Sequence, residues 1–424
     1  MSDNPFVLKR LGVKNVPKNW EIKPLSKIVA EGKPIVYGIV QAGPHVEGGI
    51  PYIKSTDVNR PLVLDELQRT SVEIASKYKR SDVAPGDIVF SLRGNIGVSC
   101  IVPNSINLAN LTQGTARLSV NGSNENTFVR HALSGLPVRR QIHAYGKGST
   151  FKEISLEELR KLFILLPPLT EQQKIAAVLS TWDRAIELTE KLIAAKQKRK
   201  QALIHKLITE PLLTMRHRKP KSGWEDARLG TLIEKRTEKS SDLESFPLHS
   251  FTIANGVTAK TDRYERSFLL KDSENNEYAL VRFEDFVVNP MNLRFGAIGR
   301  SRVHEPVTVS AYYDVFRVVS LECDGSFLEH VLKSPLLMHV YESVATGSLI
   351  EKKRVHFSEF VKISISLPSL DEQTHIAGMI NVQDHEIRVL SEKTALLQRQ
   401  KKGLMQQLLT GKVRVNVDSE TAKG

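Results

Sequence analysis

Two long segments of the chain space their apolar residues alternately by four and three, which predicts helices with one continuous apolar stripe. In the first segment the stripe contains Ile175, Leu179, Trp182, Ile186, Thr189, Ile193, Lys196, Lys200, Leu203 and Leu207. In the second segment it contains Ile376, Ile380, Gln383, Ile387, Leu390, Thr394, Leu397, Lys401, Leu404 and Leu408. A repeat of 3.5 residues sustained over about five heptads is typical of a coiled coil.

The polar interruptions of the two stripes fall at similar places, with Thr189 and Lys200 in the first and Thr394 and Lys401 in the second. This agreement favours two helices that pair with each other in a fixed register. The alternative is two unrelated surface helices, each packed on its own domain. About 38 residues at a rise of ~1.5 Å give a rod of roughly 55–60 Å. An antiparallel pair of such helices would hold one domain at each end.

The segments before each long helix, about 19–165 and 223–366, mix short apolar runs with glycine, proline and asparagine turns. PYIKSTDV (51–58), DIVFSL (87–92) and VTVSAYYDVFRVV (307–319) are examples of these runs. Short runs of this kind between turn signals predict compact domains of the α/β or α+β class.

The chain also repeats its own sequence at a distance of about 200 residues. LPPLTEQQKIAAVLS (166–180) returns as LPSLDEQTHIAGMIN (367–381), with seven of the fifteen positions identical. Three further pairs occur in the same order, beginning near Trp20 and Trp224, at 84–102 and 282–303, and at 146–167 and 345–368. The shared order indicates duplication of one unit made of a globular part and a long helix. Thr170, with Gln173 in a capping box, and Asp371 are the expected caps of the two helices.

These patterns predict an α/β (α+β) fold with two globular domains joined by two long helices. The helices are expected to form an antiparallel coiled coil, and the whole chain an internal pseudo-twofold repeat of about 200 residues.

Charge adds a clue about partners. Sixty Lys and Arg residues against 47 Asp and Glu residues give a formal net charge of +13 and a pI near 9.5. Such an excess favours a polyanionic partner, most often nucleic acid. No apolar run approaches the ~20 residues that span a membrane, and the first residues show no secretory signal. Cys100 and Cys323 have neither metal-binding nor disulfide spacing, so we expect reduced thiols and a cytoplasmic location.

Enzyme motifs were sought and not found in the sequence. There is no Gly-x-x-x-x-Gly-Lys-Ser/Thr phosphate loop and no Gly-x-Gly-x-x-Gly nucleotide loop. The 12 histidines are scattered, so no metal site is predicted. Asn289-Pro290 is similar to the start of the Asn-Pro-Pro-aromatic loop of adenine methyltransferases. However, Met291 and Asn292 stand where the proline and the aromatic residue are needed, so we interpret this segment as a turn.

Along nearly its whole length the chain resembles the specificity (S) subunit of Type I restriction–modification enzymes. The family pattern is a Pro-x-x-x-Glu-Gln-x-x-Ile opening followed by a long helix that ends near Leu-Leu-Thr-Gly-Lys. The second copy carries both ends, as Pro368, Glu372-Gln373 and Ile376, then as Leu408-Leu409-Thr410-Gly411-Lys412. The first copy departs at its end, where Glu210-Pro211 replaces Gly-Lys.

The resemblance implies a non-catalytic, sequence-specific subunit that binds double-stranded DNA with a bipartite target. Two target-recognition domains would each read one half of the target, and the helices would set the spacer length. The same helices would dock two modification (methyltransferase) subunits, and restriction (translocase–nuclease) subunits would complete the complex. The chain itself would need no cofactor, because S-adenosylmethionine, ATP and Mg are expected only in the partner subunits. The implied division is 1–165 and 216–366 for recognition, with 166–215 and 367–424 as helical spacer regions.

Candidate DNA contacts are side chains that can bind phosphates or base edges, in segments whose glycines allow a close backbone approach. They are Lys54, Arg93, Asn95, Lys147, Lys152, Arg294, Arg300, Arg302, Lys352, Lys353 and Arg354.

Two alternatives remain open. One is a coiled-coil scaffold with two ligand-binding ends and no role on DNA. The other is an enzyme that modifies nucleic acid by itself.

Overall fold

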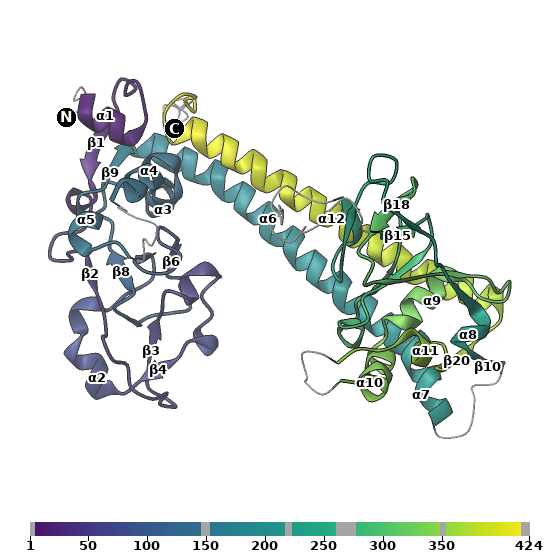
Figure 1. Cartoon of the computed structure of the whole chain (residues 1–424). Helices are drawn as coiled ribbons and strands as arrows, with labels where there is room; N and C mark the ends of the chain where they lie inside the picture. Colours follow the sequence, from purple (N-terminus) through teal and green to yellow (C-terminus); the bar gives the residue numbers. More distant parts are fainter. Residues whose placement is uncertain (1–4, 146–152, 217–222, 260–276, 348–352, 417–424) are drawn as a thin grey trace, which may run out of the picture. The chain divides into compact units, whose positions relative to one another are not determined.

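The structure is a computed structural model, and it describes residues 5–145, 153–216, 223–259, 277–347 and 353–416. Two compact units divide the chain. The first contains Met1–Glu190 and Glu392–Gly424, and the second contains Lys191–Ser391. Two long helices, α6 (Leu169–Ile204) and α12 (Leu370–Leu408), contribute to both units (Figure 1). The predicted four-segment division remains a prediction, because each compact unit contains parts of both helices.

The first unit is built from three small sheets and short helices. β1 pairs antiparallel with β9, a second sheet has the order β2-β8-β5-β6, and a third has the order β4-β3-β7. Its strands are β1 (Glu21–Pro24), β2 (Val36–Tyr37), β3 (Ile50–Ile53), β4 (Arg69–Thr70), β5 (Ile88–Ser91), β6 (Ser99–Ile101), β7 (Asn110–Leu111), β8 (Thr115–Leu118) and β9 (Phe163–Leu166). Its short helices are α1 (Pro5–Leu11), α2 (Val72–Lys77), α3 (Asn126–Ser134), α4 (Leu136–Tyr145) and α5 (Leu156–Arg160).

The second unit repeats this plan. β10 pairs with β20 as β1 does with β9, and the sheet β11-β19-β16-β17 corresponds to β2-β8-β5-β6. The remaining sheets are β12-β15-β18 and β13-β14. The strands are β10 (Glu225–Arg228), β11 (Ile233–Lys235), β12 (Lys239–Ser240), β13 (His249–Thr252), β14 (Gly256–Ala259), β15 (Tyr278–Val281), β16 (Phe286–Val288), β17 (Ile298–Arg300), β18 (Val307–Val309), β19 (Asp314–Val318) and β20 (Ser364–Leu367). The short helices are α8 (Leu229–Leu232), α9 (Gly325–Leu332), α10 (Pro335–Val344) and α11 (Phe357–Phe360). The predicted mixed fold with two packed long helices is confirmed.

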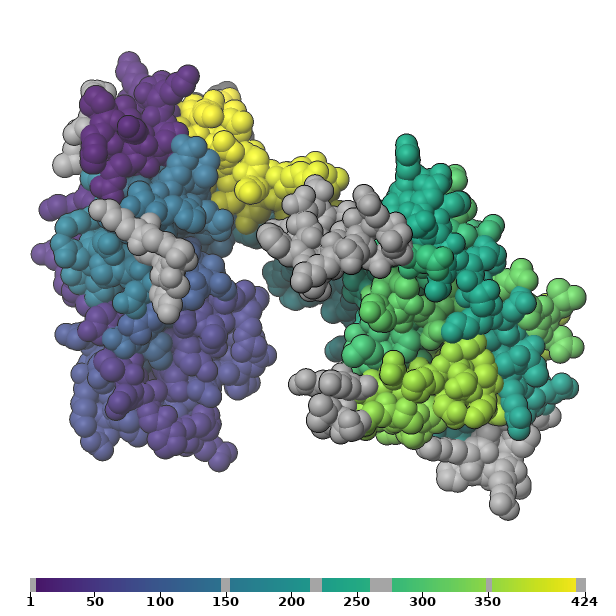
Figure 2. Space-filling model, viewed as in Figure 1, coloured from purple at the N-terminus to yellow at the C-terminus, as the bar shows by residue number. Residues whose placement is uncertain are grey.

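The main core of each unit includes both long helices. In the first unit, Ile175 and Leu179 of α6 are buried in one cluster with Leu408 and Leu409 from the end of α12 and its following turn. In Figure 2 this yellow C-terminal region packs beside the purple N-terminal residues. In the second unit, Ile376 and Ile380 share the equivalent cluster with Ile208 and Leu212, which follow α6. Each unit is therefore completed by the far end of the other copy's helix.

The repeated Glu-Gln motif attaches each long helix to its own unit. The amide of Gln172 donates to the Pro167 carbonyl oxygen at 2.9 Å and accepts from the backbone N–H of Glu125, the N-cap of α3, at 3.0 Å. Gln373 makes the same two contacts, with Pro368 and with Asp324, the N-cap of α9, each at 2.9 Å. Both glutamines are buried. The motif thus joins the first turn of the long helix to the first turn of a short one.

Glu171, the neighbouring residue of the motif, is also buried. Its carboxylate accepts from the Trp20 indole N–H at 3.1 Å and from Nε of Arg414 at 2.6 Å. A buried carboxylate needs such partners, because desolvating an unpaired charge is costly. Trp20, marked by the sequence repeat, therefore serves to hold the start of α6.

The predicted helix caps, Thr170 and Asp371, are each wrong by two residues. α6 already begins at Leu169, and the backbone N–H groups of Glu171 and Gln172 bond to the Pro168 carbonyl oxygen. In the second copy the hydroxyl of Ser369, not Asp371, accepts from the Glu372 backbone N–H at 3.3 Å. Pro168 stands directly before the first helical residue, Leu169. The helix therefore begins before Thr170, the residue that the sequence pattern indicated as its cap.

The two long helices run antiparallel within each unit. In the first unit Lys401 pairs with Asp183, and the Gln398 amide lies 3.4 Å from Glu190. In the second unit, Nζ of Lys200 lies 2.5 Å from Asp384. Lys196 pairs there with Glu386 at 2.6 Å. Lys401–Asp183 and Lys200–Asp384 are the same ion pair in the two copies, since their members are 201 positions apart.

The stripe residues lie along this helix pair. Ile175, Leu179, Ile376, Ile380 and Leu408 are buried. The other apolar stripe residues are half-buried, namely Trp182, Ile186, Ile193, Leu203, Leu207, Ile387, Leu390, Leu397 and Leu404. The polar stripe residues Thr189, Gln383 and Thr394 are buried, and the lysines at this stripe reach carboxylates on the opposite helix.

The end of the first long helix departs from α-helical geometry. A π-helical turn, His205–Thr209, follows α6 and leads into α7 (Glu210–Arg216). Pro211 cannot donate a backbone hydrogen bond, and its ring displaces the carbonyl of the preceding turn. The widened turn accommodates this proline, so the helical path continues beyond the Glu210-Pro211 departure seen in the sequence.

Gln172→Ala should lower the free energy of unfolding of the first unit by about 1–3 kcal/mol, because it leaves buried backbone groups of Glu125 and Pro167 without partners. Chemical denaturation followed by hydrogen exchange in α3 measures this loss. Gln173→Ala is the matched control, since Gln173 is the exposed neighbour on the same helix. Equal stabilities of the two variants would contradict the anchoring role.

The stability of the first unit should also depend on His131. Burial, assisted by the charge of Arg130, lowers the pKa of His131 from 6.5 to about 3, although Asp183 opposes the shift. The folded unit thus keeps His131 neutral while the unfolded chain protonates it. The free energy of unfolding should therefore fall as the pH decreases from about 6.5 towards 3, by at most ~1.4 kcal/mol per pH unit for this residue.

His131→Asn removes this contribution, so its stability loss between pH 7 and pH 5 should be smaller than that of the unmodified chain. Denaturation curves at the two pH values measure the difference. His375→Asn, an exposed position on α12, serves as the control and should behave like the unmodified chain. Parallel losses in all three proteins would exclude a neutral buried His131.

Candidate nucleic-acid interface

Three of the predicted contacts of the first unit, Lys54, Arg93 and Asn95, lie on the loops that follow β3 and β5. Lys54 follows β3, and its backbone N–H donates to the Asp57 carboxylate at 2.9 Å. Asn95 follows β5 and donates from its side chain to Asn59 at 3.2 Å. These two loops are joined through the turn before β8, where Thr112 N–H bonds to the Ile53 carbonyl and Leu92 N–H to the Gly114 carbonyl. The structure therefore brings Lys54 and Asn95 to one face.

Arg93 lies on the same loop as Asn95, and its Nε donates to the Glu153 carboxylate at 2.5 Å. Both side chains are about half exposed, so water screens the pair and its contribution to stability is small. Gly94 and Gly97 flank Asn95 with φ angles of +69° and +87°, which only glycine adopts without strain. Lys147 and Lys152, the other predicted contacts in the first copy, lie outside the described residues.

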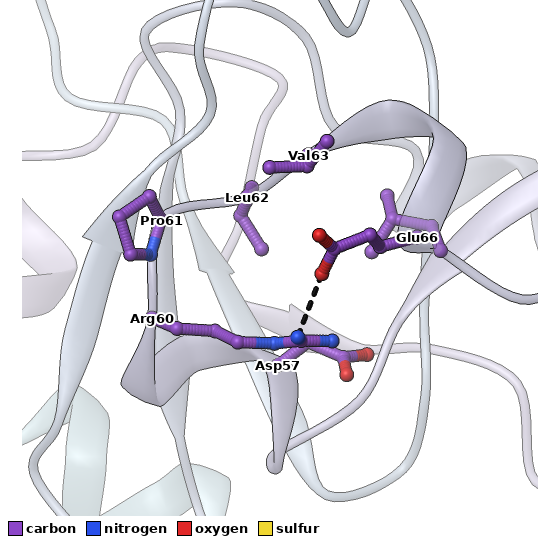
Figure 3. Close-up of a pocket in the computed structure, with 7 residues that line it drawn as sticks. Asp57, Arg60, Pro61, Leu62, Val63 and Glu66 are labelled. Carbon is purple, nitrogen blue, oxygen red and sulfur yellow. Dashed lines mark ion pairs between the residues drawn. The ribbon is translucent and has the colours of Figure 1, made fainter. Parts of the chain in front are cut away.

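The loop that follows Lys54 encloses a small hollow lined by residues between Asp57 and Leu67. In Figure 3 the Arg60 guanidinium reaches across the hollow to Glu66, with Leu62 and Val63 on the other side. Nη1 of Arg60 lies 2.6 Å from the Glu66 carboxylate, and both side chains are exposed. This ion pair closes the loop that also contains Asp57, the acceptor for Lys54 N–H. Lys54 therefore lies at the start of a loop whose first turn is fixed by its own backbone bond to Asp57.

Arg300 and Arg302 form an ion-pair network at one side of the second unit. Arg300 pairs with Glu284, and its side chain is only 10% exposed. Arg302 lies 2.9 Å from Glu329 of α9 and is 54% exposed. Although burial alone raises the pKa of Glu329, the charges of Lys333, Arg302 and Arg300 hold it below its ordinary value. The guanidinium of Arg300 is thus committed to carboxylates of its own unit.

Arg294 is in a similar position. It lies 3.4 Å from Glu342 of α10, over the ring of Phe295, with an 8% exposed side chain. Lys353 reaches the same Glu342 at 2.9 Å. Arg354 is exposed and forms no ion pair with any residue that the structure describes. Lys352 falls outside the described residues. Of the predicted cations in this unit, Arg302 and Arg354 are the ones most open to an external phosphate or base.

Several residues that the sequence reading did not select line two grooves, one in each unit. Tyr37, Gln113 and Glu153 line the first, together with Arg93. Lys235, Tyr312 and His356 line the second, together with Arg354. Tyr312 lies in the turn between β18 and β19 and is 89% exposed.

The described residues contain neither a cluster of metal ligands nor a helix that could cross a membrane. Over the described residues, no group of three or more His, Cys, Asp or Glu side chains is arranged to hold a metal ion. Burial raises the pKa of the free thiols Cys100 and Cys323 to about 12, which keeps them protonated near neutral pH. Within the same part of the chain, no helix combines the length and apolar character needed to cross a membrane.

The fold and its loops define a protein built by duplication, in which two mixed α/β units share an antiparallel pair of long helices. Residues 17–196 match the family model described as Type I restriction modification DNA specificity domain. The chain is 31% identical over 179 residues to the EcoBI specificity subunit of Escherichia coli, covering 41% of this chain and 38% of that protein. It is 25% identical over 285 residues to the MjaVIII specificity subunit of Methanocaldococcus jannaschii, covering 63% of this chain and 66% of that one.

The fold has a counterpart among solved structures. The Type I restriction–modification S subunit from M. genitalium superposes with a TM-score of 0.59 at 16% identity, over 92% of this chain and 96% of that one. At this identity the likeness concerns the fold alone. The matched regions span less than two thirds of the length of the EcoBI and MjaVIII subunits.

Taken together, these findings support the sequence-based resemblance to specificity subunits of Type I restriction–modification systems, with residues 17–196 matching the DNA specificity domain of that family. Members of this family are the recognition components of their complexes and have no catalytic centre.

Arg300→Ala should lower the free energy of unfolding of the second unit by about 1.5–3 kcal/mol, because it removes the charged contacts that a nearly buried guanidinium makes with Glu284 and Glu329. Arg302→Ala is the matched variant and should cost less than about 1 kcal/mol, since the Arg302 side chain is exposed. Urea denaturation measures both losses. A larger loss for Arg302→Ala would reverse the assignment of Arg300 as the structural member of the network.

Proposed function

We propose that this chain is the DNA-recognition subunit of a Type I restriction–modification complex, and that each unit reads one half of a bipartite double-stranded target. The duplication carries this proposal. Each unit has the same sheet order around its main core and the same glutamine contact to its long helix. Two equivalent units on one chain suit a target made of two separate half-sites. Residues 1–165 and 216–366 are then the recognition domains, and 166–215 and 367–424 are the spacer regions.

The charge of the chain supports DNA as the partner. A net charge of +13 supplies cations for phosphate contacts, and binding through such contacts weakens steeply as the salt concentration rises. Lys54 and Arg354 can serve this purpose without breaking an ion pair to any residue that the structure describes. A scaffold without a role on DNA would show no such salt dependence.

Outward residues of the long helices support docking of two methyltransferase subunits. Val382, Val389 and Leu396 are exposed on α12 and follow one another at intervals of seven, which places them along one stripe. Leu188 and Leu192 are exposed on α6. We assign restriction subunits, S-adenosylmethionine, ATP and Mg to the rest of the complex, and the assembly to the cytoplasm.

A paired deletion tests the proposal. Removing residues 187–193 together with 388–394 shortens each helix by one heptad and keeps Lys401–Asp183 and Lys200–Asp384 in the same relative register. Seven residues at ~1.5 Å each are about 10 Å. This length corresponds to about three base pairs at ~3.4 Å per step. Footprints of the full chain with its methyltransferase subunits should show two protected blocks that move about three base pairs closer in the variant.

The sequence of each half-site should stay the same in the shortened protein. Deleting 187–193 alone is the control, because it puts the two ion pairs out of register with each other and should abolish the paired footprint. A single continuous footprint in the unmodified complex would refute the bipartite reading. Unchanged spacing in the paired deletion would refute the role of the helices as a spacer. Binding insensitive to salt would favour the scaffold alternative.

A further inference from the structure

The two grooves occupy equivalent places in the duplicated units. The first, of about 220 Å³, lies between β2, the end of β5, the turn before β8 and the residues that precede α5. The second, of about 270 Å³, lies between β11, the end of β16, the start of β19 and the residues that precede α11. One backbone hydrogen bond recurs beneath both: Ile154 N–H to the Leu92 carbonyl and Val355 N–H to the Pro290 carbonyl, each at 3.0 Å.

This shared bond identifies matching positions around the grooves. Ile154 and Val355 are both buried and apolar, so the base of the groove is the same in the two copies. On the rim, Glu153 of the first groove corresponds to Arg354 of the second, and Arg93 corresponds to Met291. The backbone at the base of the groove is therefore the same in both copies, whereas the matching rim position is an acid in the first copy and a base in the second.

The first groove presents both acceptors and donors. Arg93 binds Oε2 of Glu153, and Oε1 has no hydrogen bond to any residue in the described ranges. The side chains of Gln113 and Tyr37 likewise make none within those ranges. A carboxylate accepts from the exocyclic amino group of cytosine, and a glutamine amide pairs with N6 and N7 of adenine. This rim fits a base edge that carries an amino group.

The second groove presents mainly donors. Lys235 is paired with Asp314 at 2.5 Å, so its charge is compensated within the unit. Arg354 and His356 are exposed beside it, and Tyr312 is 89% exposed. An arginine binds the O6 and N7 acceptors of guanine, and an outward aromatic ring offers a surface for stacking or van der Waals contact. This rim fits an edge made of acceptors.

We infer that these grooves are the base-reading sites of the two units. The first groove selects a base with an exocyclic amino group in the major groove, and the second selects guanine. The inference rests on the proposed function, because it assigns base choice to residues within the recognition domains. Glu153 and Arg354 are the opposed specificity residues, at one matching position of the duplicated unit.

The test uses the full chain assembled with its methyltransferase subunits and DNA libraries randomised in each half-site. Glu153→Gln and Gln113→Ala should each relax the preference at one position of the half-site read by the first unit, by about tenfold or more. The other half-site should be unchanged. Arg354→Ala should relax one position of the opposite half-site only. Glu153→Arg should move the first unit's preference towards guanine.

The controls replace exposed lysines that pair with a glutamate three or four residues earlier in the chain. Lys77→Ala in the first unit and Lys362→Ala in the second should leave every position of both half-sites unchanged. Uniform weakening across all sequences by the groove variants, with a salt slope smaller by about one, would mean phosphate contact and would overturn the inference. So would an unaltered base preference. A complex without any sequence preference before mutation would instead refute the proposed function itself.

Discussion

The buried amides of Gln172 and Gln373 are the contacts on which the architecture depends. Each amide bonds to the carbonyl of a proline in the strand exit and to the first backbone N–H of a short helix. A side-chain amide can donate and accept at the same time, and no apolar residue could satisfy both backbone groups. The first turn of each long helix is therefore fixed to its own unit. The position of every later residue of the helix depends on that first turn.

The antiparallel pairing adds a second level of order. Lys401–Asp183 and Lys200–Asp384 are related by the duplication, so they specify antiparallel register without distinguishing the two copies. Lys196–Glu386 has no counterpart, because the matching positions are Ala185 and Leu397. Polar residues in a helix seam fix register because an incorrect pairing leaves them desolvated and unpaired. The seam is thus nearly symmetric, and Lys196–Glu386 is an ion pair that differs between its two halves.

The sequence was most informative where one physical pattern determines the structure. A four-three spacing specifies a helix stripe whatever the surrounding fold, so Ile175 through Leu408 could be selected directly. Cap positions were less predictable, because Pro168 and Ser369 compete with Thr170 and Asp371 for the same role. The cations were least predictable. The amino-acid sequence alone does not show that Arg300 lies between two glutamates while Arg354 remains exposed. The grooves are equally hard to predict, because they combine residues more than a hundred positions apart in the chain.

The burial of Ile208 and Leu212 in one unit, and of Leu408 and Leu409 in the other, has a consequence for how the chain can be divided. A cut between the two copies does not release two independent domains. Each half would keep a helix end whose apolar residues pack in the core of the other unit. It would also lack the helix end that completes its own core. The copies are joined by reciprocal exchange, so the smallest autonomous piece of this protein is the complete pair.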